Sequence, residues 1–140
     1  MIDMMATAKS IFESGKYTCV IAKNDDLFTS TEKGIRPIIM LLSQSPDKIR
    51  DGACADKVIG KAAALLLVYG GIKEVFASVI SRSALDFLTT HGIPTRHGML
   101  VEFIKNRTGD GICPMEQRAV ILDSPEQAFI IFSELILQSS

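Results

Sequence analysis

The sequence lacks the surface chemistry of several large functional classes. It carries 15 Lys and Arg against 16 Asp and Glu, which gives a formal net charge of -1, and it has no polybasic run. A protein that coats duplex nucleic acid or an anionic membrane needs a basic surface, so we expect neither partner. The longest apolar run, from Ala62 to Tyr69, is far shorter than the roughly 20 residues that cross a bilayer.

The sequence has three cysteines and no recognisable targeting signal. The cysteines Cys19, Cys54 and Cys113 are odd in number and far apart, which argues against a disulfide framework and for a reducing compartment. The segment from Met1 to Met5 has no basic stretch followed by an apolar one, so no signal peptide is indicated. We therefore expect a cytoplasmic protein.

Compact metal and catalytic motifs are missing as well. The sequence has no Cys-x-x-Cys or His-Glu-x-x-His spacing, and its histidines, His91 and His97, lie around the turn at Pro94. It therefore predicts no zinc site and no other cofactor. There is no Gly-x-Ser-x-Gly elbow that would indicate a Ser-His-Asp triad, and the glycine-rich stretch lacks the Lys-Ser/Thr ending of a P-loop.

The chain does have enough apolar material for one core. Hydrophobic residues make up 47% of it and charged residues 22%, which is a globular balance. A chain of 140 residues has the length of one domain and can bury a core without metal or disulfide support. We expect a single domain spanning residues 1–140.

Periodicity and turn residues predict alternating helices and strands. The apolar stretch Gly52 to Ala55 is expected to end at Asp56. The order predicts a three-layer α/β domain, α-β-α, with a mixed β-sheet. The expected elements are a helix from Asp3 to about Ser14, a hairpin of Tyr17–Ala22 and Leu27–Ser30, a helix through Ile38–Leu42 after Pro37, a helix from Asp56 to Tyr69, a strand at Val75–Ile80, a helix capped near Ser81 or Ser83, a strand around Thr95–Met99, a short helix from Pro114 and a last helix from Ser124 through Leu137.

The segment from Asp56 to Tyr69 is apolar almost all round after its first turns, which predicts a helix buried in the middle of the domain. In the simplest interpretation Asp56 is its N-cap. Lys57 and Lys61, one helical turn apart, would share a face. They either extend to solvent or face an anion, which would be Asp56, Glu116 or a ligand phosphate.

A glycine inside this segment and a turn-rich stretch further on add to the prediction. Gly60 is costly within a helix, which indicates that another group packs close against that turn. The stretch that starts at Asn106 contains glycines that leave backbone amides open to an anion. Pro114 as a first helical residue makes Cys113 the N-cap and puts Glu116 in the first turn.

Cys113 therefore has two interpretations. It is either a small cap or a nucleophile, because a thiol at the positive end of a helix has a lowered pKa. In an enzyme of that kind Asp56, Asp110 or Glu116 would move protons.

Together, the blocks Asp56–Ala64 and Asn106–Glu116 resemble the two signature blocks of an uncharacterised bacterial and archaeal family, a domain of unknown function with a cytidine-deaminase-like fold. The resemblance covers almost the whole chain. It implies a mixed sheet between helices and a site at the N-termini of central helices. In deaminases one such helix begins with His-x-Glu or Cys-x-Glu and the next with Pro-Cys-x-x-Cys. Here the helix starts carry Asp56-Lys57 and Ser81-Arg82-Ser83-Ala84, so the zinc ligands and the proton-shuttling glutamate are missing.

Three functional hypotheses remain open. The leading one is binding of a nucleotide or another small phosphorylated ligand, such as an ADP-ribose-type molecule. A rival is a metal-independent enzyme with Cys113 as nucleophile. A third is an interaction module in which the apolar C-terminal helix, with Phe129, Ile130, Phe132, Ile136 and Leu137, pairs with a second copy to form a homodimer. The residues expected to bind the ligand are Lys57, Lys61, Asn106, Arg107, Thr108, Gly109 and Asp110.

Overall fold

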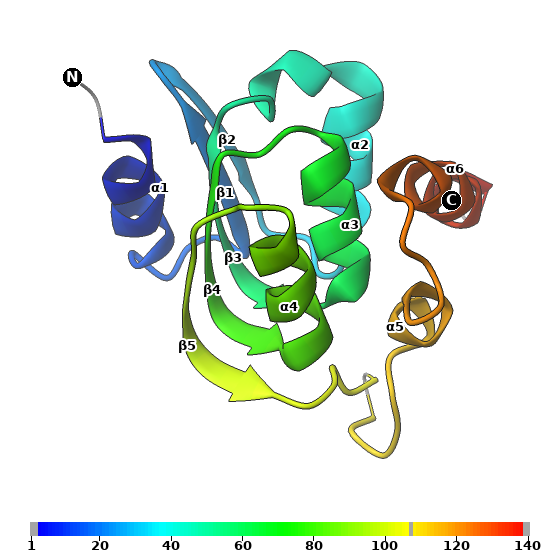
Figure 1. Ribbon diagram of the computed structural model, residues 1–140. Helices are drawn as coiled ribbons and strands as arrows, with labels where there is room; N and C mark the ends of the chain where they lie inside the picture. The colour runs from blue at the N-terminus through cyan, green and yellow to red at the C-terminus, as the bar shows by residue number, and fades with distance from the viewer. Residues whose placement is uncertain (1–2, 107, 139–140) are drawn as a thin grey trace.

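A five-stranded mixed β-sheet forms the centre of the protein, in the order β2-β1-β3-β4-β5. The computed structural model describes residues 3–106 and 108–138. Figure 1 shows one helix, α1, on one face of the sheet and the helices α2, α3 and α4 on the other. The elements are α1 (Met4–Phe12), β1 (Cys19–Lys23), β2 (Asp26–Ser30), α2 (Arg36–Gln44), the 3-10 turn η1 (Pro46–Lys48), β3 (Ala53–Ile59), α3 (Lys61–Tyr69), β4 (Glu74–Ser81), α4 (Arg82–Thr90), β5 (Thr95–Val101), α5 (Pro114–Ala119) and α6 (Pro125–Gln138).

The connections bring several chain ends to one edge of the sheet. β1 pairs antiparallel with β2 and with β3, whereas β3, β4 and β5 run parallel and are joined by α3 and α4. The carboxyl ends of β2, β3, β4 and β5 and the first turns of α2, α3 and α4 therefore lie at the same edge, at the bottom of Figure 1. We call it the carboxyl edge. Open α/β sheets bind their ligands at such an edge.

Local capping and turn chemistry explain several element boundaries. Asp3 caps α1 by accepting a hydrogen bond from the amide of Ala6, and Ser81 caps α4 by accepting one from the amide of Ala84. Asn24 adopts a positive φ of 53° in the turn between β1 and β2, which asparagine tolerates better than most residues. The predictions of a first helix, a hairpin, a helix after Pro37, a strand at Val75–Ile80 and a mixed sheet are confirmed.

The predicted helix start at Asp56 is wrong. Residues Ala53–Ile59 form β3, and α3 begins at Lys61 after Gly60, which is extended (φ -100°, ψ -177°). The strand continues past Asp56 because Val58 and Ile59 are β-branched and pair with β4, while β1 pairs with β3 as far as Asp56. Asp56 is therefore not an N-cap. Lys57 and Lys61 lie on different elements and do not share a helix face.

The helix α3 is buried on all sides, as its sequence predicts. It lies between the sheet and α6, and α2 and α4 flank it, so α5 and α6 add a layer outside the expected three (Figure 1). Phe132 of α6 is fully buried, and the ring of Phe129 stacks on Tyr69 with 4.7 Å between centroids. Much of the apolar surface of α6 is thus used within the chain. Ile130 remains 52% exposed.

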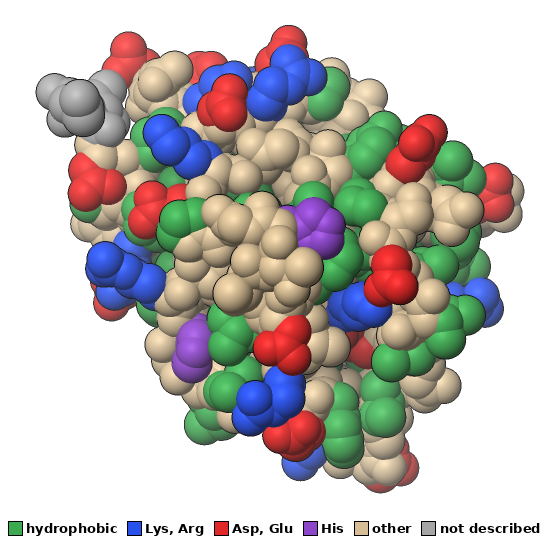
Figure 2. All heavy atoms as spheres, viewed as in Figure 1, with side chains coloured by type: hydrophobic (Ala, Val, Ile, Leu, Met, Phe, Trp, Pro, Cys, Tyr) green, Lys and Arg blue, Asp and Glu red, His purple; other side chains and the backbone are tan. Residues whose placement is uncertain are grey.

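Charged side chains of both signs are interspersed on the face shown in Figure 2. That face carries no extended patch of one sign. Within the described residues, no helix is both long enough and apolar enough to span a bilayer.

Candidate functional site

The N-terminus of α3 is occupied by a side chain from a distant part of the chain. Glu116, in the first turn of α5, accepts hydrogen bonds from the amide of Lys61 at 2.6 Å and from the amide of Ala62 at 3.0 Å. The carboxylate thereby satisfies two amides that the helix itself leaves unpaired. Burial raises the pKa of Glu116, and these amide hydrogen bonds partly oppose that rise. The anion expected near Lys61 is therefore Glu116.

Gly60 provides the space for this carboxylate. A Cβ atom on Gly60 would lie 2.2 Å from Cδ of Glu116, closer than real Cβ contacts allow. The prediction that another group packs close against Gly60 is confirmed, although Gly60 is the N-cap of α3 and not a residue within the helix.

Lys61 ties the end of α5 to the start of α3. Its ammonium group donates to the carbonyl oxygen of Val120 at 3.2 Å and lies 3.5 Å from the carboxylate of Asp123, while Lys61 as a whole is only 9% exposed. Asp123 is almost fully exposed, so this ion pair is screened by solvent. Lys61 is thus engaged in holding α5. Lys57 lies on β3 with an exposed side chain.

In the loop before α5, several polar groups of the described residues hydrogen-bond to one another. The side chain of Asn106 donates to Asp110 at 3.2 Å and accepts from the amide of Gly109 at 2.9 Å, and the hydroxyl of Thr108 donates to Asp110 at 2.5 Å. Hydrogen bonds from Thr108 and Asn106 lower the pKa of Asp110. The amide of Gly109, expected to face an anion, is therefore already bonded within the loop. Arg107 lies outside the described residues.

The structure places Cys113 and Glu116 at the start of α5 and Asp56 on a different element, β3. Cys113 is the N-cap of the six-residue helix α5 and makes no capping hydrogen bond through its side chain. Glu116 is bound to α3, and Asp56 is buried on β3. Burial raises the pKa of Asp56 to about 7. Asp56 lies with Cys19 and Cys54 in a group whose sulfur and oxygen atoms are all within 4.8 Å of one another. The prediction of no metal site considered only ligands close in sequence and did not include this group.

Three cationic side chains line a cleft at the carboxyl edge, beside the first turn of α2. The cleft has a volume of about 610 Å³ and is lined by Glu32, Lys33, Arg36, Lys105 and Asn106. The cations come from two segments some seventy residues apart in the sequence. We call it the basic cleft.

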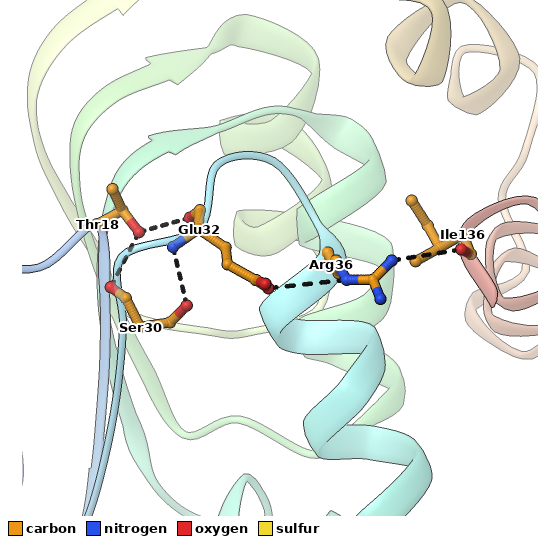
Figure 3. A network of polar contacts seen from close by, with 5 residues as sticks. All are labelled: Thr18, Ser30, Glu32, Arg36 and Ile136. Carbon is orange, nitrogen blue, oxygen red and sulfur yellow. Dashed lines mark hydrogen bonds and ion pairs between the residues drawn. The ribbon is translucent and has the colours of Figure 1, made fainter. Parts of the chain in front are cut away.

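Hydrogen bonds fix the loop that forms one wall of the basic cleft (Figure 3). The hydroxyl of Thr18 donates to the carbonyl oxygen of Glu32 at 2.6 Å, and the amide of Glu32 donates to the hydroxyl of Ser30 at 3.1 Å. The guanidinium of Arg36 lies 3.9 Å from the carboxylate of Glu32 and donates to the carbonyl oxygen of Ile136 at 3.5 Å. These contacts hold the side chain of Arg36, at the start of α2, against α6.

A second, more apolar cleft shares Lys105 with the first. It has a volume of about 410 Å³. It contains one aromatic ring, that of Phe103, whose side chain is 51% exposed. We call it the apolar cleft. Its lining residues are Val58, Val79, Val101, Glu102, Phe103, Ile104 and Lys105.

A family model described as TM1506, Domain of unknown function (DUF1893), matches residues 7–136. The chain belongs to this family. A similar solved structure is that of a DUF1893 family protein (TM1506) from Thermotoga maritima, with a TM-score of 0.83 and 24% sequence identity. The match covers 100% of this chain and 92% of that one, and it shows a shared fold. No curated protein matches the chain significantly.

Asn106 of the basic cleft was predicted from the sequence as a ligand-binding residue, whereas Lys33, Arg36 and Lys105 were not. A partial signal was present, since Lys33 and Arg36 stand on either side of Gly34-Ile35, next to the helix start that Pro37 marks. Cys19 and Cys54 were considered only for disulfides and for short metal motifs. The alternation Cys54-Ala55-Asp56, which puts a thiol and a carboxylate on one face of a strand, was the available clue.

Proposed function

We propose that the protein binds a small phosphorylated ligand, a nucleotide or an ADP-ribose-like molecule, at the carboxyl edge. The observation that carries this proposal is the basic cleft, in which Lys33, Arg36 and Lys105 surround a volume of about 610 Å³. This set replaces Lys57 and Lys61 as the proposed anion ligands, because Glu116 already occupies the start of α3. Asn106, which the sequence predicts as a ligand-binding residue, also lines the basic cleft.

The charge of the lining favours a phosphate. The cleft has three cations against the single carboxylate of Glu32. A guanidinium binds phosphate oxygens through two parallel hydrogen bonds, and lysines add point charges that need no fixed geometry. Arg36 is already held in position by Glu32 and by the carbonyl oxygen of Ile136, so part of the entropy of ordering it is lost before a ligand arrives.

The apolar cleft supplies the complementary half of a nucleotide site. Lys105 lines both clefts, so the two clefts adjoin at this side chain. A ligand whose phosphate lies in the basic cleft can therefore extend past Lys105 into the apolar cleft. Phe103 offers an exposed ring on which a base can stack. The carboxylate of Glu102 can accept hydrogen bonds from ribose hydroxyls. A polar cleft next to an apolar one is typical of small-molecule sites.

The cytidine-deaminase-like fold belongs to the same proposal. Its support is the order of helices and strands, together with the clustering of helix starts at the carboxyl edge. The helices at that edge begin with Arg36-Pro37, Lys61-Ala62 and Arg82-Ser83. None of these starts has the His-x-Glu or Pro-Cys-x-x-Cys sequence that binds the deaminase zinc. Zinc-dependent deamination is therefore not part of the proposal.

Isothermal titration calorimetry against a panel of nucleotides, nucleosides and ADP-ribose tests the proposal. We expect binding of at least one phosphorylated compound and weaker binding of its nucleoside. Lys33→Ala and Lys105→Ala should each weaken binding about tenfold or more, because each removes a charge-assisted contact. Lys73→Ala is the matched control, since Lys73 is an exposed lysine just before β4, at the opposite edge of the sheet. Equal affinity in all three variants, or no binding of any phosphorylated compound, would contradict the proposal.

A further inference from the structure

Two cysteines and an aspartate converge in the core, outside both clefts. Cys19 on β1 lies directly opposite Asp56 on β3, and Cys54 lies two residues before Asp56, opposite Ile21. Residues that are paired across strands or two apart along a strand project from the same face of the sheet. The three side chains therefore point the same way, and their two sulfur atoms and a carboxylate oxygen all lie within 4.8 Å of one another. We call them the thiol-carboxylate cluster.

The register brings Cys19 and Asp56 especially close. The amide of Lys57 donates to the carbonyl oxygen of Thr18 at 2.9 Å, which makes Thr18 and Lys57 a hydrogen-bonded pair. Pair types alternate along an antiparallel ladder, so Cys19 and Asp56 form the narrower, non-hydrogen-bonded pair. This geometry is set by the backbone and by burial of the sheet, and it holds the donors in place before any ligand binds.

The cluster is buried and contains an acidic side chain. Cys19 is 2% exposed, Cys54 is 0% exposed and Asp56 is 7% exposed. Asp56 accepts a hydrogen bond from the amide of Val58 at 3.3 Å. Throughout residues 3–106 and 108–138, no cationic side chain forms an ion pair with it. A buried carboxylate without a nearby positive charge is costly, so the fold leaves a place where a cation is favourable.

The donors suit a borderline-soft divalent ion. Thiolate sulfur and carboxylate oxygen both bind Zn²⁺, at roughly 2.3 Å and 2.0–2.2 Å, and a tetrahedral ion holds two such sulfurs about 3.8 Å apart. The spacing in the cluster is compatible with small side-chain adjustments around an ion. Hard ions such as Mg²⁺ prefer sites made of oxygen alone, so the two sulfurs disfavour them.

We propose that Cys19, Cys54 and Asp56 form a binding site for one zinc-like divalent cation, which links β1 to β3 inside the core. Each thiol gives up its proton to solvent as its sulfur binds the ion, and the two positive charges of the ion offset two of the three negative charges of the thiolates and the carboxylate. The remaining coordination position is filled from outside this set. The site does not depend on the phosphorylated ligand of the clefts.

Titration of the reduced, chelator-treated protein with Cd²⁺ tests the site, because thiolate-to-cadmium charge transfer gives an ultraviolet band. We expect the band to saturate at one equivalent per chain. Cys19→Ala and Cys54→Ala should each strongly reduce it, and Asp56→Asn should weaken affinity about tenfold or more. Cys113→Ala is the matched control and should keep the full band, because Cys113 is not part of the cluster. Zn²⁺ should raise the Tm of the wild type.

A second measurement covers the case in which the core variants fail to fold. X-ray absorption of the zinc-loaded wild type should show two sulfur neighbours at about 2.3 Å, with the other neighbours oxygen or nitrogen. A wild type without a charge-transfer band at one equivalent would overturn the proposal. So would a band that is lost in Cys113→Ala, or a zinc environment without sulfur.

Discussion

The carboxylate of Glu116 lies where a side chain on Gly60 would have to be. A Cβ atom on Gly60 would lie 2.2 Å from Cδ of Glu116, while the same carboxylate caps α3 through the amides of Lys61 and Ala62. The N-cap residue of α3 thus has no capping side chain of its own, and a residue of α5 acts in its place. The contact joins the C-terminal third of the chain to the central helix.

Gly60→Ala should therefore destabilise the protein by about 1–3 kcal/mol, because the new methyl group displaces Glu116 from both amides. Urea denaturation followed by circular dichroism measures the free energy of unfolding. The matched control is the same substitution in a Glu116→Ala background, where the methyl group meets no carboxylate. There its cost should fall by at least about 1 kcal/mol, which is the coupling expected of residues in contact. Fully additive effects would show that the two residues do not interact.

Removing Glu116 should also create an anion site at the start of α3. In Glu116→Ala the amides of Lys61 and Ala62 lose their acceptor, and a helix N-terminus with open amides binds sulfate or phosphate. Sulfate should raise the Tm of Glu116→Ala more than that of the wild type, by about 4 °C for each kcal/mol of binding free energy. The reference is chloride at equal ionic strength. An equal rise in both proteins would mean that Glu116 does not occupy an anion site.

Elements with their own local signals could be predicted from the sequence. The hairpin is marked by Asn24 in its turn, α4 by Ser81 at its start and α2 by Pro37 in its first turn. The all-round apolar pattern of Ala62 to Tyr69 correctly predicted a helix buried on every side. In each case the deciding chemistry lies within a few residues of the element.

The error at Asp56 has a different cause. The apolar stretch before α3 is short, and periodicity alone does not separate a buried strand from a helix over so few residues. Pairing of β3 with both β1 and β4 decides in favour of the strand, and that pairing is a property of the whole sheet. For the same reason, the sequence did not predict Lys105 as part of the basic cleft, nor the thiol-carboxylate cluster. In both cases the fold brings together residues that lie far apart in the sequence.

Asp56 makes the stability of the metal-free protein depend on pH. Burial raises its pKa to about 7 in the folded protein, against an ordinary value of 3.8. Below the ordinary value the carboxyl is protonated in both states and its burial costs little. As pH rises toward 7 the unfolded chain ionises while the folded protein keeps the proton, so stability is lost over this range and the loss levels off above it.

Asp56→Asn should remove this dependence. With the cluster kept metal-free by a chelator, the wild type should lose up to about 4 kcal/mol relative to the variant between pH 4 and pH 8, at about 1.4 kcal/mol per pH unit. The amide oxygen of asparagine can still accept from the amide of Val58, so the variant is expected to fold. Urea denaturation at several pH values measures the difference, in which the other titrating groups cancel. A difference that does not change with pH would show that Asp56 is ionised in the core, and a smaller wild-type deficit at pH 8 than at pH 5 would reverse the assigned direction of its pKa.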